Sequence, residues 1–191
     1  MLYAIPDIHG QARELDRALA LVEADGGPDA PVIFLGDYVD RGPDSRGVLD
    51  RLIAGRDAGR PWRFVYGNHD QMFLRFVREA QTHDSRILSG KGWLHPSLGG
   101  CTTLASYLPS TDDTARDLLA LAGLEPASDP TRDRLVAAAC AAVPALHLDF
   151  IEGLPTHIRE NGLLFVHAGI RPEVPLAQQD PDDLVWIREP F

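Results

Sequence analysis

Residues 32–43 read Val32-Ile33-Phe34-Leu35-Gly36-Asp37-Tyr38-Val39-Asp40-Arg41-Gly42-Pro43. The run opens with four apolar residues, a pattern typical of a short strand that is buried on both faces. A loop rich in glycine and aspartate follows, and a helix is expected from about Asp44. Its buried stripe consists of four apolar residues at helical spacing, Val48, Leu49, Leu52 and Ile53. The stretch therefore predicts a unit of strand, polar loop and helix.

The same unit occurs three times in the first part of the chain. Strand-like runs at residues 2–5, 32–35 and 63–66 each precede a polar loop and then a helical pattern. This order is typical of an α/β chain with a largely parallel or mixed sheet. Ligands of such sheets gather at the carboxyl ends of the strands. We therefore expect the three loops to converge on one site.

The pattern changes between about Ala80 and His147, where shorter helical segments are interrupted by glycine and proline. We expect a helical cap inserted into a single domain that spans residues 1–191. Beyond it, two strand-like runs at 156–159 and 163–166 flank an Asn-Gly pair, which is a strong signal for a two-residue β-hairpin turn. The second of these strands leads directly to His167.

Charge restricts the partners of the chain. Acidic side chains outnumber basic ones, 28 to 18, and the formal net charge is −10. A field of this sign opposes binding to nucleic acid and to anionic membranes, so we expect neither as a partner. A phosphate site in this chain needs local positive charge, which bound metal ions and a few arginines would supply.

The cysteines and the N-terminal segment bear on the compartment. Cys101 and Cys140 are the only cysteines, and their spacing fits neither a zinc site nor a redox pair. We expect both thiols to be reduced and structural. Neither a signal peptide nor a transmembrane pattern is recognisable in the sequence, which predicts a cytoplasmic protein.

Five potential metal ligands lie directly after apolar strands: Asp7, His9, Asp37, Asn68 and His167. Carboxylate, amide and imidazole groups are the ligands of divalent ions such as manganese, iron, zinc or magnesium, and no thiolate is present to favour softer metals. One carboxylate, such as that of Asp37, can bridge two ions. Two such cations would polarise phosphoryl oxygens and generate a hydroxide nucleophile near neutral pH.

Four sequence blocks carry a resemblance to a known family. They are Asp7-Ile8-His9-Gly10, Gly36-Asp37-Tyr38-Val39-Asp40-Arg41-Gly42, Gly67-Asn68-His69-Asp70 and His167-Ala168-Gly169, with weaker echoes at Gly99-Gly100, Thr103-Leu104, Ser106-Tyr107 and Trp186-Ile187-Arg188. The sequence resembles the calcineurin-like metallophosphoesterases, within them the bacterial branch of serine/threonine phosphoprotein phosphatases and symmetrical diadenosine tetraphosphatases. The resemblance implies a sandwich of mixed β-sheets flanked by helices.

The resemblance also implies a binuclear metal centre, with manganese as the favoured ion. Asp7 and His9 would hold the first ion, and Asp37 would bridge. Asn68 and His167 would hold the second. Relatives supply a further histidine from a Gly-His segment after the Trp-x-Arg motif, and this sequence ends before such a segment. We therefore expect weaker occupancy of the second metal position.

Four further residues receive catalytic roles from the same resemblance. His69 would protonate the leaving-group oxygen, and Asp40 would orient its ring, with Asp70 as the competing candidate for that second role. Arg41 and Arg188 would clamp the phosphate oxygens, because a guanidinium offers a planar fork of donors. Alternatively, Arg41 pairs with Asp40 or Asp44 and only ties down its loop, and Arg188 has only a structural role. The remaining histidines are expected to be structural or on the surface: His83, His95, His147 and His157.

Three functions remain open from the sequence. The leading prediction is hydrolysis of phosphomonoesters, above all phosphoserine or phosphothreonine in proteins, by in-line attack of a metal-bridging hydroxide. The alternative is symmetrical cleavage of dinucleoside tetraphosphates by the same core with a different cap. The third is a catalytically impaired metal-binding interaction protein, suggested by the absent histidine.

Overall fold

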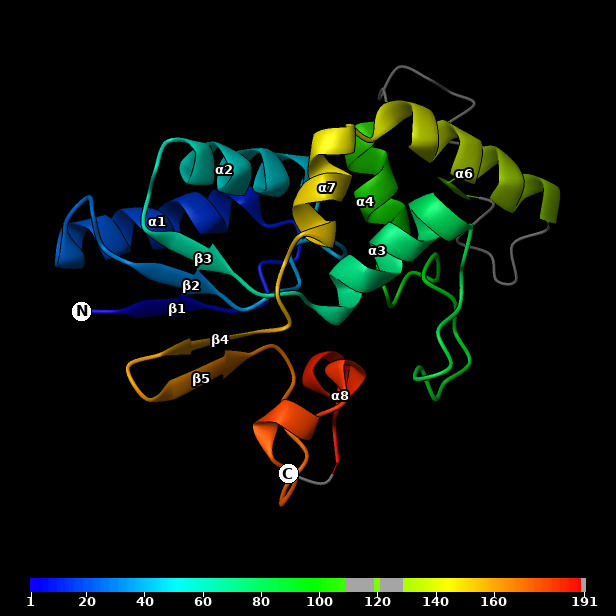
Figure 1. Ribbon diagram of the computed structural model, residues 1–191. Coiled ribbons are helices and arrows are strands. Elements are labelled where there is room, and N and C mark those ends of the chain that lie inside the picture. The colour runs from blue at the N-terminus through cyan, green and yellow to red at the C-terminus, as the bar shows by residue number, and fades with distance from the viewer. Residues whose placement is uncertain (109–118, 121–128, 190–191) are drawn as a thin grey trace.

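The centre of the fold is a sheet of three short parallel strands (Figure 1). The computed structural model describes residues 1–108, 119–120 and 129–189. The strands are β1 (Tyr3–Ile5), β2 (Val32–Phe34) and β3 (Trp62–Phe64), in the order β1-β2-β3. The parallel register pairs Ala4 with Ile33 and Ile33 with Arg63, so the carboxyl ends of all three strands meet at one edge.

The two faces of this sheet are covered differently. Helices α1 (Ala12–Gly26) and α2 (Ser45–Asp57) lie above it in Figure 1. The antiparallel hairpin of β4 (His157–Glu160) and β5 (Leu163–Val166) lies below it. The fold therefore has a helical layer, a parallel sheet and a second, two-stranded sheet.

The side chains of β2 explain how so short a strand holds the two layers together. Val32 and Phe34 belong to the main hydrophobic cluster with α1 and α2. Ile33, which is fully buried, packs with Val65 and Ile158 on the hairpin side. Successive strand residues point to opposite faces, so a continuous apolar run supplies both cores at once.

The predicted α/β class with mixed strand pairing is confirmed. Strand β5 has the predicted bounds, and Asn161 and Gly162 have φ values of 51° and 78°, as a type I′ hairpin turn requires. The third strand was predicted over 63–66, but β3 ends at Phe64. The reason is that the Tyr66 N–H leaves the sheet and donates to the Pro155 carbonyl at 3.0 Å.

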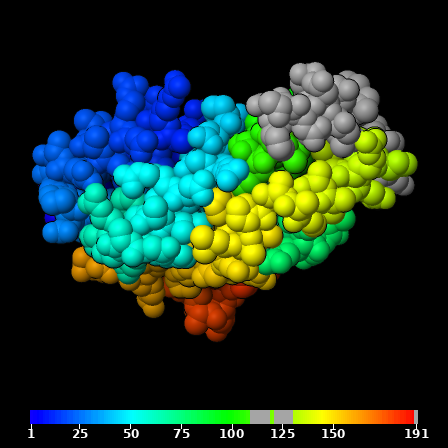
Figure 2. All heavy atoms as spheres, turned by 90° about the horizontal axis from the view of Figure 1, so that it is seen from above, coloured from blue at the N-terminus to red at the C-terminus, as the bar shows by residue number. Residues whose placement is uncertain are grey.

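The predicted cap includes helices packed against α2 and against α3 (Asn68–Glu79). It contains α4 (Gly100–Tyr107), α6 (Asp129–Ala142) and the start of α7 (Ala145–Glu152), and its residues 109–118 and 121–128 lie outside the described part of the chain. Seen from above, α7 (yellow) lies beside α2 (cyan), and α6 continues away from it (Figure 2). The cap and the α/β part share the main hydrophobic cluster.

His147 links three helices from within the core, a structural role of the kind expected for it. Its Nδ1 accepts a hydrogen bond from the Tyr107 hydroxyl of α4 at 2.8 Å, and its Nε2 lies 2.9 Å from Oδ1 of Asp50 on α2. The residue is 1% exposed. Burial is the main reason why the pKa of His147 lies below its ordinary value of 6.5, although the bond to Asp50 partly opposes this shift.

The lowered pKa of His147 predicts a loss of stability in mild acid. Below about pH 6.5 the unfolded chain protonates this histidine while the folded chain keeps it neutral, so the unfolded state binds more protons and the free energy of unfolding falls as the pH falls. Urea denaturation from pH 7.5 down to pH 5 checks this. His147→Gln should show a shallower decline than the wild type. His83→Gln, at an exposed histidine, should follow the wild type, and parallel curves for all three proteins would contradict the assignment.

The C-terminal segment returns to the strand-end edge through the 3₁₀ turn η1 (Leu176–Gln178) and helix α8 (Pro181–Trp186). The Trp186 indole N–H donates to Oε1 of Gln71 on α3 at 2.6 Å. The Arg86 guanidinium lies 4.9 Å from the centre of the Trp186 ring and forms an ion pair with Asp182 at 2.6 Å. These contacts attach α8 beside the polar loops.

Hydropathy and length of the helices bear on the membrane question. In the described ranges, no single helix is long and apolar enough to cross a bilayer, and only the consecutive helices α6 and α7, bent by 95° at their junction, reach that length and hydropathy together.

Candidate active site

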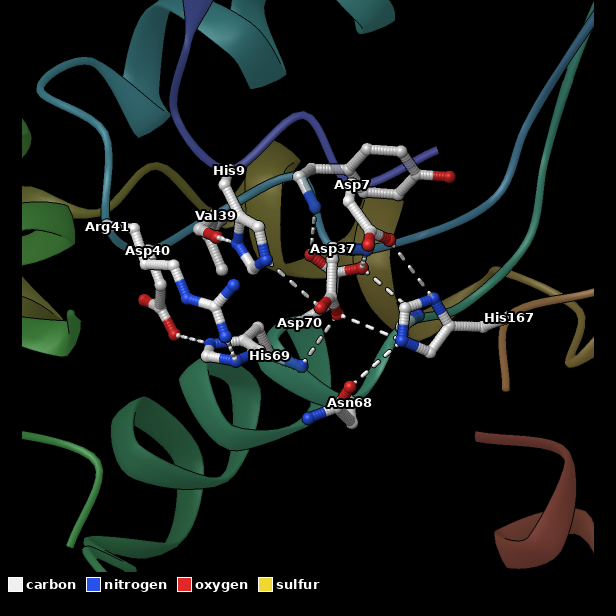
Figure 3. A network of polar contacts seen from close by, with 12 residues as sticks. Asp7, His9, Asp37, Val39, Asp40, Arg41, Asn68, His69, Asp70 and His167 are labelled. Carbon is white, nitrogen blue, oxygen red and sulfur yellow. Dashed lines mark hydrogen bonds and ion pairs between the residues drawn. The ribbon is translucent and has the colours of Figure 1, made fainter. Parts of the chain in front are cut away.

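The strand-end loops meet in a cavity of about 220 Å³ (Figure 3). The five predicted metal ligands line it together with the three predicted residues that would contact substrate, His69, Arg41 and Arg188. The remaining predicted residue, Asp40, is fully buried and contacts the ring of His69. Side chains that are up to 181 residue numbers apart thus meet at one edge of the sheet, as the order of strands and loops predicted.

The backbone of the loops is strained at the candidate site. Five non-glycine residues there have positive φ, from 42° at Asp7 to 73° at Asp40, and the others are His9, Asp37 and Arg41. L-residues adopt this region rarely, and each such residue costs about 1–3 kcal/mol. The surrounding hydrogen bonds must hold these conformations, and their clustering at the cavity is typical of a functional site.

Asp70 holds the loop that carries Asp37. Its carboxylate accepts hydrogen bonds from the backbone N–H groups of Asp37 and Tyr38 at 2.9 Å and of Gly67 at 3.1 Å. Burial and the neighbouring Asp37 raise the pKa of Asp70, while these three donors favour its charged form. Asp70 was the competing candidate for the partner of His69. It instead connects the loop after β2, which carries Asp37, to the start of α3.

Two histidines direct their Nε2 atoms toward Asp37. A carbonyl oxygen only accepts hydrogen bonds, so Nδ1 of His9 donates to the Val39 carbonyl at 2.8 Å and Nδ1 of His167 donates to that of Leu35 at 2.7 Å. Burial lowers the pKa of His9 below its ordinary value, which favours the neutral ring. Each Nε2 lies 3.4 Å from an oxygen of Asp37, and in a neutral ring whose Nδ1 donates, Nε2 carries a lone pair.

Divalent cations fit this arrangement. Lone pairs that face carboxylate oxygens repel one another unless a cation lies between them. Two groups of donor atoms, each within 4.8 Å of one another, share Asp37: one joins it with His9 and His69, the other with Asp7 and His167. In addition, Oδ1 of Asn68 lies 2.9 Å from Nε2 of His167. Oxygen and nitrogen donors without thiolate match borderline-hard ions.

His69 and Asp40 form a buried pair next to these groups. Nδ1 of His69 donates to Oδ2 of Asp40 at 2.7 Å, and Nε2 of His69 lies 3.1 Å from Nη2 of Arg41. Because a guanidinium only donates, Nε2 is the acceptor of that bond. Both ring nitrogens of His69 therefore have hydrogen-bond partners, although its distances also place it in the first donor group.

The two arginines of the site differ in their attachment. Arg41 contacts His69, and among the described residues it forms an ion pair with neither Asp40 nor Asp44, which were the alternatives expected from the sequence. Arg188 follows α8 and lines the cavity, and it is exposed. Both guanidinium groups thus border the cavity that also contains the candidate ligands.

Sequence reasoning missed Trp93 and Thr103. Both come from the predicted cap, and both donate hydrogen bonds to the Asp40 carboxylate, each at 2.7 Å. A signal for Thr103 was present, because Thr103-Leu104 is one of the weaker echoes of the family motifs. Trp93 lay in no recognised block. Through these two side chains, the predicted cap contacts Asp40, the hydrogen-bond partner of His69.

A parallel sheet whose strand-end loops bring together carboxylate, amide and imidazole ligands beside a histidine–aspartate pair defines a metallophosphoesterase fold. The sequence profile of the calcineurin-like phosphoesterases matches residues 2–189. The chain belongs to this family, and membership implies divalent metal ions at the site.

Three proteins illustrate what the chain is similar to. It is 29% identical over 171 residues to a symmetrical bis(5'-nucleosyl)-tetraphosphatase of Ralstonia nicotianae, covering 90% of this chain and 42% of the relative. It is 28% identical over 176 residues to the protein of the same description from Janthinobacterium sp., covering 92% and 46%. A crystal structure provisionally described as a diadenosine tetraphosphatase matches with a TM-score of 0.56 at 22% identity, covering 95% of this chain and 56% of that one. The chain thus spans less than half the length of these two curated relatives.

Proposed function

We propose that this chain hydrolyses phosphoric esters and anhydrides in the cavity at the strand ends, with dinucleoside tetraphosphates as substrates that it cleaves symmetrically. The observation that carries the proposal is that the two candidate cation groups share Asp37 and that His69, a member of the first group, contacts Arg41 through its Nε2. This arrangement has donors for metals, a proton donor and a phosphate clamp within one cavity.

The choice of substrate departs from the leading prediction. The sequence favoured a serine/threonine protein phosphatase and kept the tetraphosphatase as the alternative. The two relatives described above are symmetrical tetraphosphatases, which supports the alternative over the phosphoprotein reading. The set of acid, clamp and ligand residues also argues against an impaired, purely metal-binding protein.

The size and charge of the cavity fit the phosphate chain of such a substrate. A volume of about 220 Å³ is below the 300–1,000 Å³ typical of pockets that enclose a drug-sized ligand, so the nucleosides would lie outside it. The chain carries a net charge of −10, which repels a polyanion at a distance. Arg41 and Arg188, together with bound cations, would provide the local attraction.

Asp7, His9, Asp37, Asn68 and His167 would hold two divalent cations, with manganese as the favoured ion. The ions would supply Lewis acidity, which polarises the phosphoryl oxygens and makes a nearby water more acidic. Arg41 and Arg188 would orient the phosphoryl group for attack in line with the departing oxygen. In the net reaction, one P–O bond breaks at the oxygen that links the two central phosphorus atoms, the water oxygen bonds to the phosphorus that is released, and two nucleoside diphosphates form.

His69 would provide the proton for the departing oxygen. Its Nε2 accepts a hydrogen bond from Arg41 in the structure. A phosphoryl group in the cavity offers Arg41 a stronger, charged acceptor, which releases Nε2 to carry a proton. Asp40, bound to Nδ1 at 2.7 Å, stabilises the imidazolium and fixes the direction of the ring. The cleaved nucleoside diphosphate leaves with that proton.

The products of diadenosine tetraphosphate test the proposal. We expect manganese-dependent conversion to ADP alone, resolved by ion-exchange chromatography, with turnover of a phosphoserine peptide at least about tenfold slower. ATP and AMP as products would reject symmetrical cleavage. Faster turnover of the phosphopeptide would restore the protein-phosphatase reading. A series with manganese, iron, zinc and magnesium after chelator treatment identifies the ion that supports the reaction.

A further inference from the structure

Asp40 receives three side-chain hydrogen bonds, and two of them come from the predicted cap. Its Oδ2 accepts from Nδ1 of His69 and from Nε1 of Trp93, both at 2.7 Å. Its Oδ1 accepts from the Thr103 hydroxyl at 2.7 Å. We propose that Trp93 and Thr103 are positioning residues for proton transfer by His69 and that they act through the Asp40 carboxylate, an inference that rests on the proposed function.

Because the Asp40 carboxylate is buried, it needs the hydrogen bonds from both Trp93 and Thr103. Asp40 is 0% exposed, so water cannot solvate a carboxylate oxygen that loses its partner. His69 alone would leave one oxygen of Asp40 without a side-chain donor, and the carboxylate could then turn about its terminal torsion. Donors on both oxygens fix the plane of the carboxylate, and that plane fixes the direction of the His69 ring. Figure 3 shows the bond between Asp40 and this ring.

Thr103 also supports the strained backbone of this loop. Its hydroxyl oxygen accepts from the Asp40 N–H at 2.8 Å and contacts the hydroxyl of Ser45 at 3.0 Å. Asp40 has a φ of 73°, a conformation that needs external support in a residue other than glycine. One threonine therefore binds both the main chain and the side chain of Asp40.

Two glycines at the start of α4 allow Trp93 and Thr103 to lie close to Asp40. A Cβ at Gly99, whose φ is +91°, would lie 2.2 Å from the Arg41 nitrogen, and one at Gly100 would lie 2.5 Å from the Trp93 ring. The start of α4 therefore approaches Arg41 and Trp93 as closely as only glycines permit. The Trp93 ring packs 4.7 Å from Phe76 and 5.9 Å from Phe73 of α3, the helix that begins with Asn68 and His69. The Trp93 ring therefore packs against α3, the helix that also carries His69.

Substitution of Trp93 or Thr103 can show whether these residues position His69 for proton transfer or only stabilise the fold. Trp93→Phe and Thr103→Val each remove one donor to the Asp40 carboxylate and keep most of the buried volume. Thr103→Val also removes an acceptor of the Asp40 N–H, which keeps the hydroxyl oxygen of Ser45 as its acceptor at 3.1 Å. A hydrogen bond to a charged group contributes about 1.5–3 kcal/mol, so we expect kcat for an alkyl phosphate such as glycerol phosphate to fall about 10- to 100-fold. KM should stay within about twofold, and kcat for p-nitrophenyl phosphate should barely change, because nitrophenolate leaves without a proton.

Matched controls and a second mutation sharpen the kinetic test. Trp62→Phe removes an indole from β3 at the opposite end of the sheet, and Thr102→Val removes the neighbouring hydroxyl of α4, which donates to Gly99. Both controls should retain wild-type kinetics on both phosphates. In a His69→Ala background, Trp93→Phe should cause no further loss of kcat. Equal losses on the two phosphates, or a further loss in that background, would overturn the inference.

A measurement without turnover tests the same contacts. The Nδ1–H proton of His69 faces a buried carboxylate and should exchange slowly with solvent, so that it is visible by NMR. Trp93→Phe and Thr103→Val should each accelerate its exchange at least about tenfold, whereas Trp62→Phe and Thr102→Val should not. Unchanged exchange in both test variants overturns the inference even if the chain is active. A wild-type chain that hydrolyses no phosphate refutes the proposed function, and the exchange rates still decide the positioning.

Discussion

Asp37→Asn is expected to reduce the metal-stimulated hydrolysis of p-nitrophenyl phosphate at least about 10³-fold, because two-cation catalysis supplies several kcal/mol that depend on the shared carboxylate. Asp37 is the one side chain common to both candidate cation groups of the described residues. Its two oxygens lie 3.4 Å from the Nε2 atoms of His9 and His167, so removal of its charge weakens both groups. Bound metal, measured by mass spectrometry after gel filtration, should fall in parallel with the activity.

The fold should survive this substitution. The amide oxygen of an asparagine can still accept the hydrogen bond that Oδ1 of Asp37 receives from the His69 N–H at 2.9 Å. Asp44→Asn is the matched control, because Asp44 caps α2 by accepting from the Gly47 N–H and asparagine caps a helix equally well. An Asp37→Asn protein that keeps both its metal and more than about a tenth of wild-type activity would refute the role of Asp37 as a bridge.

His69→Ala separates substrates by their leaving groups. A positioned general acid contributes about 10²- to 10⁴-fold, and we expect a loss of that size on alkyl phosphates. Losses on p-nitrophenyl phosphate should be much smaller, because nitrophenolate needs no proton to depart. The loss on diadenosine tetraphosphate should be closer to that on p-nitrophenyl phosphate, since a departing nucleoside diphosphate, like nitrophenolate, is a far weaker base than an alkoxide. The measurement is kcat for the three substrates at saturating metal.

A control variant and a measurement of bound metal distinguish loss of the general acid from other effects of His69→Ala. His83→Ala removes an exposed histidine outside the cavity and should leave all three rates unchanged. Bound metal should stay near the wild-type level in His69→Ala, because both ring nitrogens of His69 already bond to Asp40 and Arg41. Equal losses on all three substrates would reject the general-acid role. Loss of metal from His69→Ala would instead make His69 a ligand of the first cation group.

Much of the fold was predictable because its signals are local. The apolar run at 32–35 predicted a strand, and β2 occupies Val32–Phe34 with almost no exposure. The Asn-Gly pair predicted the hairpin because only a few residue types adopt positive φ at both central positions. Strand ends were less certain: Tyr66 leaves the sheet for a carbonyl of Pro155, which is 89 residue numbers further along the chain. No local pattern reports such a partner.

The candidate ligands were also predictable, because each follows its own strand and parallel strands end at one edge of a sheet. The partner of His69 was not. Asp40 and Asp70 are both aspartates in recognised blocks, and only their surroundings distinguish them. Asp40 contacts Nδ1 of His69, whereas Asp70 accepts three backbone N–H groups and shapes the Asp37 loop.

By itself, the sequence determined which chemical groups this chain has and at which edge of the sheet they gather, since strand, loop and helix follow from short-range spacing and conformational preference. Only the tertiary structure decided how these groups are held. Trp93 and Thr103 reach Asp40 across 53 and 63 positions of the chain. Such contacts depend on how a separate set of helices packs on α3, and packing energy is spread over many side chains that no motif records.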